Sequence, residues 1–405
     1  MKTESLKNLI TISKGKKHSE TEDVKSNLKR IIRIDDLRND ENIVFTDDEN
    51  GTEVDVDDVL IAWDGANAGT IGYGKRGYIG STIARLRIIN EIELNPIFLG
   101  KFLQAKYLYL RKTATGATIP HINRNALISI KIPLPPLEEQ KRIASVLTRA
   151  EKLITKRKVS IKLLDDFLKS TFLEMFGDPV RNEKGWEKKQ INEFATIRIG
   201  PFGSLLHKED YIENGFPIIN PSHIIDGKIV FDSSFTVPNK IYTDLSNYHL
   251  KKNDIVVARR GEIGRCGIVK TNTKLLCGTG SMFIRIKGLY PPVLLQYQLY
   301  KTSIKDFLES KAKGVTMKNL NSKTLGATAL LFPPISLQNQ FASIVEKVES
   351  IKVRYQQSLT ELENLYGSVS QRAFKGELDL SRILIEEGLD SIEPIKAALQ
   401  SQTIH

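Results

Sequence analysis

The sequence predicts an α+β fold in which two mixed, mainly β domains are separated by two long helices that form an antiparallel coiled coil. Three observations support this prediction. The chain has 405 residues, more than one hydrophobic core comfortably holds. Its second half repeats its first half. Two long segments carry apolar residues at alternating steps of three and four, while the rest contains short runs rich in isoleucine and valine.

The internal repeat indicates a duplicated domain with approximate two-fold symmetry. A constant offset of 198 residues aligns Gly116 with Gly314, Thr118 with Thr316, Asn123 with Asn321, Pro135 and Pro136 with Pro333 and Pro334, Gln140 with Gln338, and Glu151 with Glu349. Such a long period excludes a solenoid of short repeats. The expected parts are a first domain over 1–136, a helix over 137–178, a second domain over 179–334, a helix over 335–376 and a tail over 377–405.

The two globular parts contain strand-like runs joined by turns. The runs include KRIIRI and DVLIAW in the first part and GFPIIN, DIVVAR and MFIRIK in the second, each followed by Gly, Asn, Asp or Pro. The run DVLIAWDGANAGTIG resembles DIVVARRGEIGRCG, and TIARLRI resembles SMFIRIK, so the domains share a pattern. Apolar spacing predicts a helix near IFLGKFLQAKYLYLRK in the first part and near VLLQYQLYKTSIKDFLES in the second.

The two long helices each follow a Pro-Pro pair and end at a glycine, Gly177 and Gly376. Their apolar stripes have the 3.5-residue period of a coiled-coil seam. One alternative is that each stripe packs only on its own globular domain, but two matching helices in one chain favour mutual pairing. The residues expected to pair the helices are Leu147, Ile154, Arg157, Ile161, Leu164 and Leu168 in the first, and Val345, Val348, Tyr355, Leu359, Leu362 and Tyr366 in the second. Arg157 and Lys352 interrupt the two seams.

The composition favours a polyanionic partner. The formal net charge is +11 and the pI is about 9.3. Between Asp35 and Asp58 nearly every charged residue is acidic, so this segment is expected to face away from a phosphate backbone. Cys266 and Cys277 are the only cysteines and show no metal-ligand spacing. The sequence has no apolar run long enough to span a bilayer, which predicts a cytoplasmic protein without membrane contact.

The order of these parts resembles the specificity subunit of a type I restriction-modification enzyme. The resemblance is carried by PLPPLEEQKRIA, PPISLQNQFA and AFKGEL, and by TGATIPHI and KGVTMKNL, which match the junctions that end each target-recognition domain in that family. It implies that 1–136 and 179–334 are target-recognition domains. Each would read one half of a bipartite site in double-stranded DNA, and the helices would set the unread spacer.

The resemblance also implies partners. Two modification subunits would methylate adenine with S-adenosylmethionine, and two ATP- and magnesium-dependent restriction subunits can join them, while this chain would need no cofactor and catalyse nothing. Other hypotheses stay open: a specificity subunit of a modification-only complex, a two-headed protein–protein adaptor without DNA contact, and an ATP-dependent enzyme. The last rests on GTIGYGKR from Gly69, a phosphate-loop pattern that lacks the required Ser or Thr and precedes a strand-like run.

Basic residues in loops are the candidates for DNA contact, because lysine binds phosphate and arginine binds phosphate or guanine. In the second domain Arg259, Arg260 and Arg265 lie in the turn after DIVVA, whereas the first domain has Trp63 and Asp64 there, which predicts that the domains read different bases. The full set of candidates is Lys14, Lys16, Lys17, Lys75, Arg76, His121 and Arg124 in the first half and His207, Lys208, Arg259, Arg260 and Arg265 in the second.

Overall fold

The computed structural model describes residues 2–21, 28–116, 118–202, 205–312 and 319–380. The chain divides into two compact units: unit 1 is Met1–Lys158 with Gln357–His405, and unit 2 is Val159–Gln356. Each unit therefore contains one globular domain and part of each long helix. The candidate residues 313–318 of the second junction and the tail beyond residue 380 lie outside the described residues.

Unit 1 is built on two four-stranded sheets. The first has the order β2 (Ile10–Lys14), β9 (Ile83–Ile88), β6 (Val59–Ala62) and β7 (Ile71–Tyr73), and the second β4 (Val44–Thr46), β3 (Lys29–Ile32), β8 (Gly77–Ile79) and β5 (Glu53–Val54). Strand β6 is buried on both faces: Leu60 and Ala62 pack in one cluster with residues of the second sheet, and Val59 and Ile61 pack in another with α1 (Pro96–Ala105). Successive strand residues point to opposite faces, so one short apolar run contributes to both cores.

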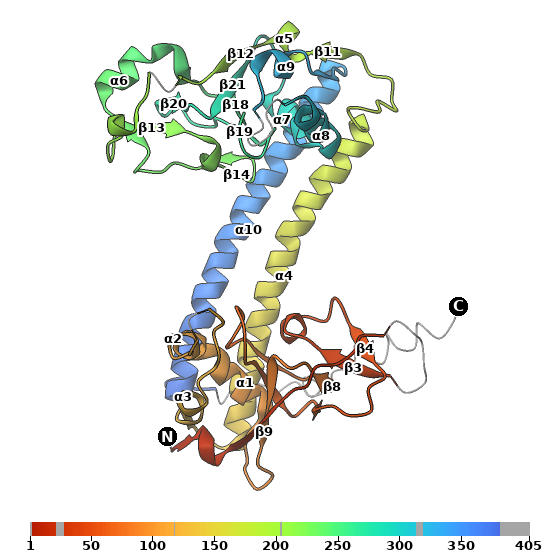
Figure 1. The fold of residues 1–405 in the computed structure, drawn as a ribbon, viewed down its shortest axis with the longest axis vertical. Helices are drawn as coiled ribbons and strands as arrows, with labels where there is room; N and C mark the ends of the chain where they lie inside the picture. The colour runs from red at the N-terminus through yellow and green to blue at the C-terminus, as the bar shows by residue number, and fades with distance from the viewer. Residues whose placement is uncertain (1, 22–27, 117, 203–204, 313–318, 381–405) are drawn as a thin grey trace. The chain divides into compact units, whose positions relative to one another are not determined.

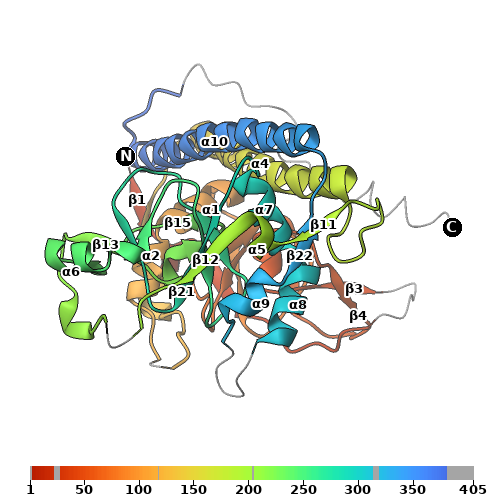
Figure 2. The same ribbon diagram turned by 90° about the horizontal axis from the view of Figure 1, so that it is seen from above.

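Unit 2 repeats this arrangement with a wider first sheet. Its order is β12 (Ala195–Ile199), β21 (Ser281–Ile286), β18 (Ile255–Ala258), β19 (Cys266–Ile268), β15 (Lys228–Ile229) and β14 (Ile224–Ile225). The second sheet is β16 (Thr236–Val237), β13 (Phe216–Ile219), β20 (Leu275–Cys277) and β17 (His249–Leu250). Helix α7 (Pro292–Tyr300) packs between the first sheet and the long helices (Figure 2). Strand β7 is an edge in unit 1, whereas its counterpart β19 pairs with β15.

Smaller elements complete each unit. They are β1 (Thr3–Ser5) with β10 (Lys131–Pro133), α2 (Tyr107–Lys112) and α3 (Arg124–Ile128) in unit 1, and β11 (Lys188–Gln190) with β22 (Ala329–Leu331), α5 (Ile191–Phe194), α6 (Asn239–Asp244), α8 (Thr302–Lys311) and α9 (Ser322–Gly326) in unit 2. Short 3-10 turns lie at Leu6–Asn8, Asp35–Leu37, Lys208–Asp210, Pro221–His223 and Ser246–Tyr248. The side chains of Asn123 and Asn321 cap α3 and α9 in the same way.

The long helices are α4 (Leu137–Phe176) and α10 (Ile335–Lys375). In unit 1 the first half of α4 lies against the last half of α10, and the Tyr366 hydroxyl donates to Glu151 Oε1 at 2.6 Å (Figure 1). In unit 2 the last half of α4 lies against the first half of α10, where the Lys352 ammonium bonds Asp165. From the first contact to the second, the residue number rises on α4 and falls on α10, so the two helices are antiparallel. The predicted antiparallel coiled coil is therefore confirmed.

The helix stripes do more than pair with each other. Among the residues expected in the seam, Leu147, Leu168, Val345, Val348 and Leu359 are buried, and Ile154, Arg157, Ile161, Leu164, Tyr355, Leu362 and Tyr366 are half-buried. The most buried ones, except Leu359, belong to clusters that also contain residues of the globular domains. The interrupting Lys352 is neutralised by Asp165 and Glu349; burial alone would lower its pKa, but these ion pairs raise it above the usual value.

Candidate nucleic-acid interface

Half of the candidate residues lie at the end of the first sheet of each unit where β6 or β18 finishes. We call this end the loop edge of a unit. It consists of Lys14–Lys17, Trp63–Gly65 and Ile119–Asn123 in unit 1, and of Ile199–Phe202, Arg259–Gly261 and Asn319–Asn321 in unit 2. Residues from three separated parts of the sequence therefore meet there in both units.

The two loop edges share one backbone frame. In unit 1 the Trp63 N–H donates to the Thr82 carbonyl at 2.7 Å, and the Trp63 carbonyl accepts from the Ile122 N–H at 2.9 Å. In unit 2 Arg259 does the same with Gly280 at 3.1 Å and with Leu320 at 2.9 Å. The next residues, Asp64 and Arg260, form backbone bridges to His121 and Asn319, respectively. The duplicated fold thus presents equivalent positions with different side chains.

An acidic side chain joins two basic ones at the loop edge of unit 1. The Lys14 ammonium lies 3.1 Å from Asp64 Oδ2, and His121 Nδ1 lies 2.6 Å from Asp64 Oδ1. Partial burial tends to raise the pKa of Asp64, but the hydrogen bonds from His121 and Lys14 outweigh it and hold this pKa below its usual value. Asp64 therefore stays ionised at neutral pH. Lys16 and Lys17, the next residues along the loop, are exposed.

Arginines and an amide occupy the loop edge of unit 2. Arg259 is largely buried, and its Nε donates to Asn319 Oδ1 at 3.1 Å. Burial and the neighbouring positive charge of Arg260 lower the pKa of Arg259 from its high usual value. Arg260 itself is exposed. Arg265 follows in the same turn, 3.8 Å from Glu262. This edge offers hydrogen-bond donors where unit 1 offers a carboxylate.

Three further candidates lie outside the residue ranges of the loop edges. Arg124 is exposed at the first position of α3, next to the capping Asn123. His207 is exposed, and its backbone N–H donates to Asp210 at 2.7 Å. The side chain of Lys208 lies outside the described part of the chain.

Lys75 and Arg76 do not join the loop edge. Because β7 runs antiparallel to β6, with Tyr73 opposite Val59, the chain leaves β7 at the opposite end of the sheet from Trp63. There Lys75 pairs with Asp40 at 2.7 Å, and the Arg76 guanidinium pairs with Asp55 at 2.8 Å. Both partners come from the acidic segment 35–58. Lys75 and Arg76 therefore do not lie near the other candidates, because β7 reverses the chain direction.

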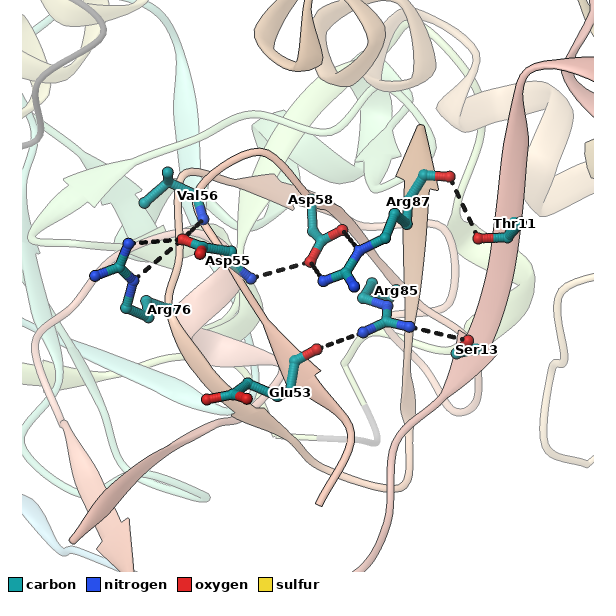
Figure 3. A network of polar contacts seen from close by, with 9 residues as sticks. All are labelled: Thr11, Ser13, Glu53, Asp55, Val56, Asp58, Arg76, Arg85 and Arg87. Atoms are coloured by element: carbon teal, nitrogen blue, oxygen red, sulfur yellow. Dashed lines mark hydrogen bonds and ion pairs between the residues drawn. The ribbon is translucent and has the colours of Figure 1, made fainter. Parts of the chain in front are cut away.

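The acidic segment is partly a scaffold rather than a free loop. The buried Asp58 accepts two hydrogen bonds from Arg87, at 2.8 and 2.7 Å, and also accepts from the Asp55 N–H (Figure 3). Unit 2 has the same pair, in which Arg285 donates to the buried Asp254 at 2.8 and 2.6 Å. Sequence reasoning did not single out these ion pairs. Their signal was present, since both Asp–Arg pairs lie in the runs that align between the halves.

The glycine-rich run after Gly69 does not form a phosphate loop. It continues into β7 and β8, whereas a phosphate loop must open a helix. Within the described ranges, no group of three or more His, Cys, Asp or Glu side chains is arranged to hold a metal ion. In the same ranges, no helix is long and apolar enough to cross a membrane.

Comparison with known proteins agrees with these features. The family described as type I restriction modification DNA specificity domain matches residues 1–163 and 183–364. The specificity subunit of the type I restriction enzyme MjaVIII from Methanocaldococcus jannaschii is 31% identical over 54% of this chain and 54% of its own length, so that match spans about half of the relative. The specificity subunit of EcoBI from Escherichia coli is 22% identical over 80% of this chain and 74% of its own length.

A solved structure has the same fold. The S subunit of a type I restriction-modification system from M. genitalium superposes with a TM-score of 0.59 at 16% identity, covering 92% of this chain and 96% of that one. A second, solved in a study of complex assembly and conformational transition of the type I R-M system, gives a TM-score of 0.56 at 17% identity, with 93% and 98% covered. With its duplicated frame and its two family matches, one in each half, this chain belongs to the type I restriction modification DNA specificity domain family.

Proposed function

We propose that this chain is the DNA-recognition subunit of a type I restriction-modification enzyme and does no catalysis itself. Each unit reads one half of a bipartite site in double-stranded DNA, and the paired helices set the spacer between the halves. The observation that carries this proposal is the shared backbone frame with different side chains at the loop edges. A duplicated scaffold with unlike reading residues is what a split, asymmetric site requires.

The exposed basic residues of the loop edges supply the proposed DNA contacts. Lys14, Lys16, Lys17 and His121 act in unit 1, and Arg260 acts in unit 2. The half-buried Arg265, which follows Arg260 in the same turn, stays a further candidate in unit 2. Arg124, which follows the loop edge of unit 1 in sequence, and the exposed His207 are further candidates, and Lys208 stays a candidate from sequence alone. Lysines here neutralise phosphates and fix the register, whereas arginine can also read a base edge in the major groove. Lys75 and Arg76 are left out of this set because carboxylates already pair with them at the opposite end of the sheet.

Helix length sets the spacer in this proposal. Helices of 40 and 41 residues rise by about 60 Å each at 1.5 Å per residue. Continuous hydrogen-bonded helices resist bending, so a change in their length is expected to change the number of unread base pairs without changing the bases read.

The long helices also carry exposed apolar side chains that fit partner subunits. Leu153 on α4 and Leu365 on α10 are 53% and 58% exposed in unit 1, and Phe167 on α4 and Ile351 on α10 are 50% and 39% exposed in unit 2. Each directly precedes a seam position, respectively Ile154, Tyr366, Leu168 and Lys352. The Glu151–Tyr366 and Asp165–Lys352 contacts put the two members of each pair at the same level of the helices.

These pairs support two equivalent docking surfaces, one in each unit. In an antiparallel pair, residues that precede matched seam positions lie on the same side of the two helices, so each pair forms one apolar patch. We propose that each patch binds one modification subunit, which gives two such subunits for each chain. These subunits would bring S-adenosylmethionine, and restriction subunits that join them would bring the ATP and magnesium site.

Co-expression of this chain with the modification subunit, followed by sequencing of methylated adenines in the host genome, tests the proposal. We expect one split motif with a modified adenine on each strand. A control shows that the modification subunit is active when it is paired with another specificity subunit. If that subunit is active but leaves the genome unmethylated when paired with this chain, the proposal is contradicted. A salt titration of DNA binding distinguishes this function from that of a protein–protein adaptor. For binding through phosphates, the logarithm of affinity falls with the logarithm of salt concentration, with a slope near 0.9 for each phosphate contact.

A further inference from the structure

Equivalent positions in the two loop edges carry opposite charges. Asp64 and Arg260 are each the second residue after a buried strand of sequence VLIA or IVVA. Each forms the backbone bridge to its junction segment, with His121 or Asn319 as partner. Because three backbone interactions match, the two side chains start from the same place in the frame and differ only in chemistry.

Asp64 is prepared to accept hydrogen bonds beside DNA. A bare carboxylate would be repelled by phosphates, but the ammonium of Lys14 offsets the charge of this one, and His121 hydrogen-bonds to its other oxygen. Each of these groups contacts a different carboxylate oxygen, and a carboxylate offers about four acceptor positions, so acceptor capacity remains. The side chain keeps 19% of its surface exposed. The fixed carboxylate suits an exocyclic amino group of cytosine or adenine.

Arg260 can donate hydrogen bonds at the position in unit 2 that corresponds to Asp64. Its neighbour Arg259 is largely buried and holds Asn319, which fixes the junction segment. Arg259 therefore acts as a positioning residue, and Arg260 is exposed to solvent. A guanidinium has five N–H donors in a planar fork that matches O6 and N7 of guanine.

We propose that Asp64 and Arg260 occupy the same reading position in the two half-sites with opposite hydrogen-bond polarity. Asp64 accepts from the amino group of a cytosine or adenine, and Arg260 donates to a guanine. This inference rests on the proposed function, since it assumes that the units read DNA through their loop edges.

Methylome sequencing of single-residue variants tests it in the full chain co-expressed with its modification subunit. Asp64→Asn keeps the shape but replaces one acceptor oxygen with a donor, so one base of one half-site should lose its preference by about tenfold, and the other half-site should not change. Arg260→Gln should move one base of the other half-site from guanine toward adenine, because glutamine pairs with adenine. Arg76→Gln, at the opposite end of the sheet, is the matched control and should alter neither half-site.

The outcomes separate this inference from the proposed function. A wild-type chain that directs no methylation overturns the proposed function itself. A wild-type split motif that stays unchanged in both Asp64→Asn and Arg260→Gln overturns only the inference. A uniform loss of methylation in Asp64→Asn, without a change of preference, would also overturn it, because Asp64 would then merely hold Lys14 and His121. Arg260 is exposed, so its variant gives a readout even if Asp64→Asn weakens folding.

Discussion

The two units differ in how they hold the glutamate that the duplication placed on each long helix. In unit 1 Glu151 bonds the ammonium of Lys101, a fully buried lysine from α1, and accepts from Tyr366. In unit 2 Glu349 pairs with Lys352 of its own helix at 3.3 Å and with Lys228 at 3.6 Å. The first arrangement depends on one buried charge, and the second is spread over several partly exposed ones. Duplicated positions thus kept their residue while its surroundings diverged.

The largest expected loss of stability comes from substituting Glu151. Glu151→Ala leaves the Lys101 ammonium buried without its partner, which we expect to cost about 3 kcal/mol. Glu349→Ala should cost about 1 kcal/mol, because Lys352 keeps its bond to Asp165. The midpoints of urea unfolding for the two variants of the full chain measure the difference. Equal midpoints would contradict the unlike roles of the two glutamates.

The ion pair common to both scaffolds gives the next effect. Arg285→Met leaves the buried Asp254 without its ion-pair partner, and Arg87→Met does the same to Asp58. Each substitution should lower the free energy of unfolding by about 2 kcal/mol. The loss should be smaller for Arg87, because that side chain is 46% exposed compared with 29% for Arg285. Thermal unfolding with Arg76→Met as the exposed control checks this. No destabilisation in either unit would show that the pair is not part of the scaffold.

Charge placed on the apolar patches tests whether the units are equivalent docking surfaces. Leu153→Glu with Leu365→Glu should reduce the number of bound modification subunits from two to one, since burial of two carboxylates in an apolar contact is unfavourable. Phe167→Glu with Ile351→Glu should have the same effect through unit 2. Native mass spectrometry of the assembled complex measures the stoichiometry. Two subunits retained with all four substitutions would contradict the docking proposal.

The smallest effect is expected from a single lysine of the loop edge. Lys17→Ala should reduce the slope of log affinity against log salt by about 0.9, with little change in which sequence is preferred. Lys29→Ala, an exposed lysine already paired with Glu53, is the control. Fluorescence anisotropy with a duplex containing the site gives both slopes. An unchanged slope for Lys17→Ala would exclude this residue from the phosphate contacts.

Much of this architecture was predictable because it depends on periodicity. The 3.5-residue repeat and the flanking Pro-Pro and glycine signals predicted both long helices, and the 198-residue offset predicted the duplicated domains. Strand direction was not predictable in the same way. Lys75 and Arg76 are near Trp63 in sequence, but the antiparallel return of β7 carries them to the far end of the sheet.

The loop edges were harder to predict because their residues come from distant parts of the chain. His121 meets Asp64 over 57 positions, and Asn319 meets Arg259 over 60, and no local pattern encodes such contacts. Nor did composition reveal that Arg259 is buried while Arg260 is exposed. Alignment of the two halves identified the equivalent turns, and the structure then gave each side chain its surroundings.

The central claim is that the units read bases and the paired helices set the distance between the half-sites. Deleting residues 155–161 of α4 together with 356–362 of α10 removes one heptad from each helix and preserves the Glu151–Tyr366 and Asp165–Lys352 contacts on either side. The methylated motif of this variant should keep both half-sites and lose about three spacer base pairs, which corresponds to about 10 Å of helix. An unchanged spacer, or altered bases in either half-site, would contradict the claim.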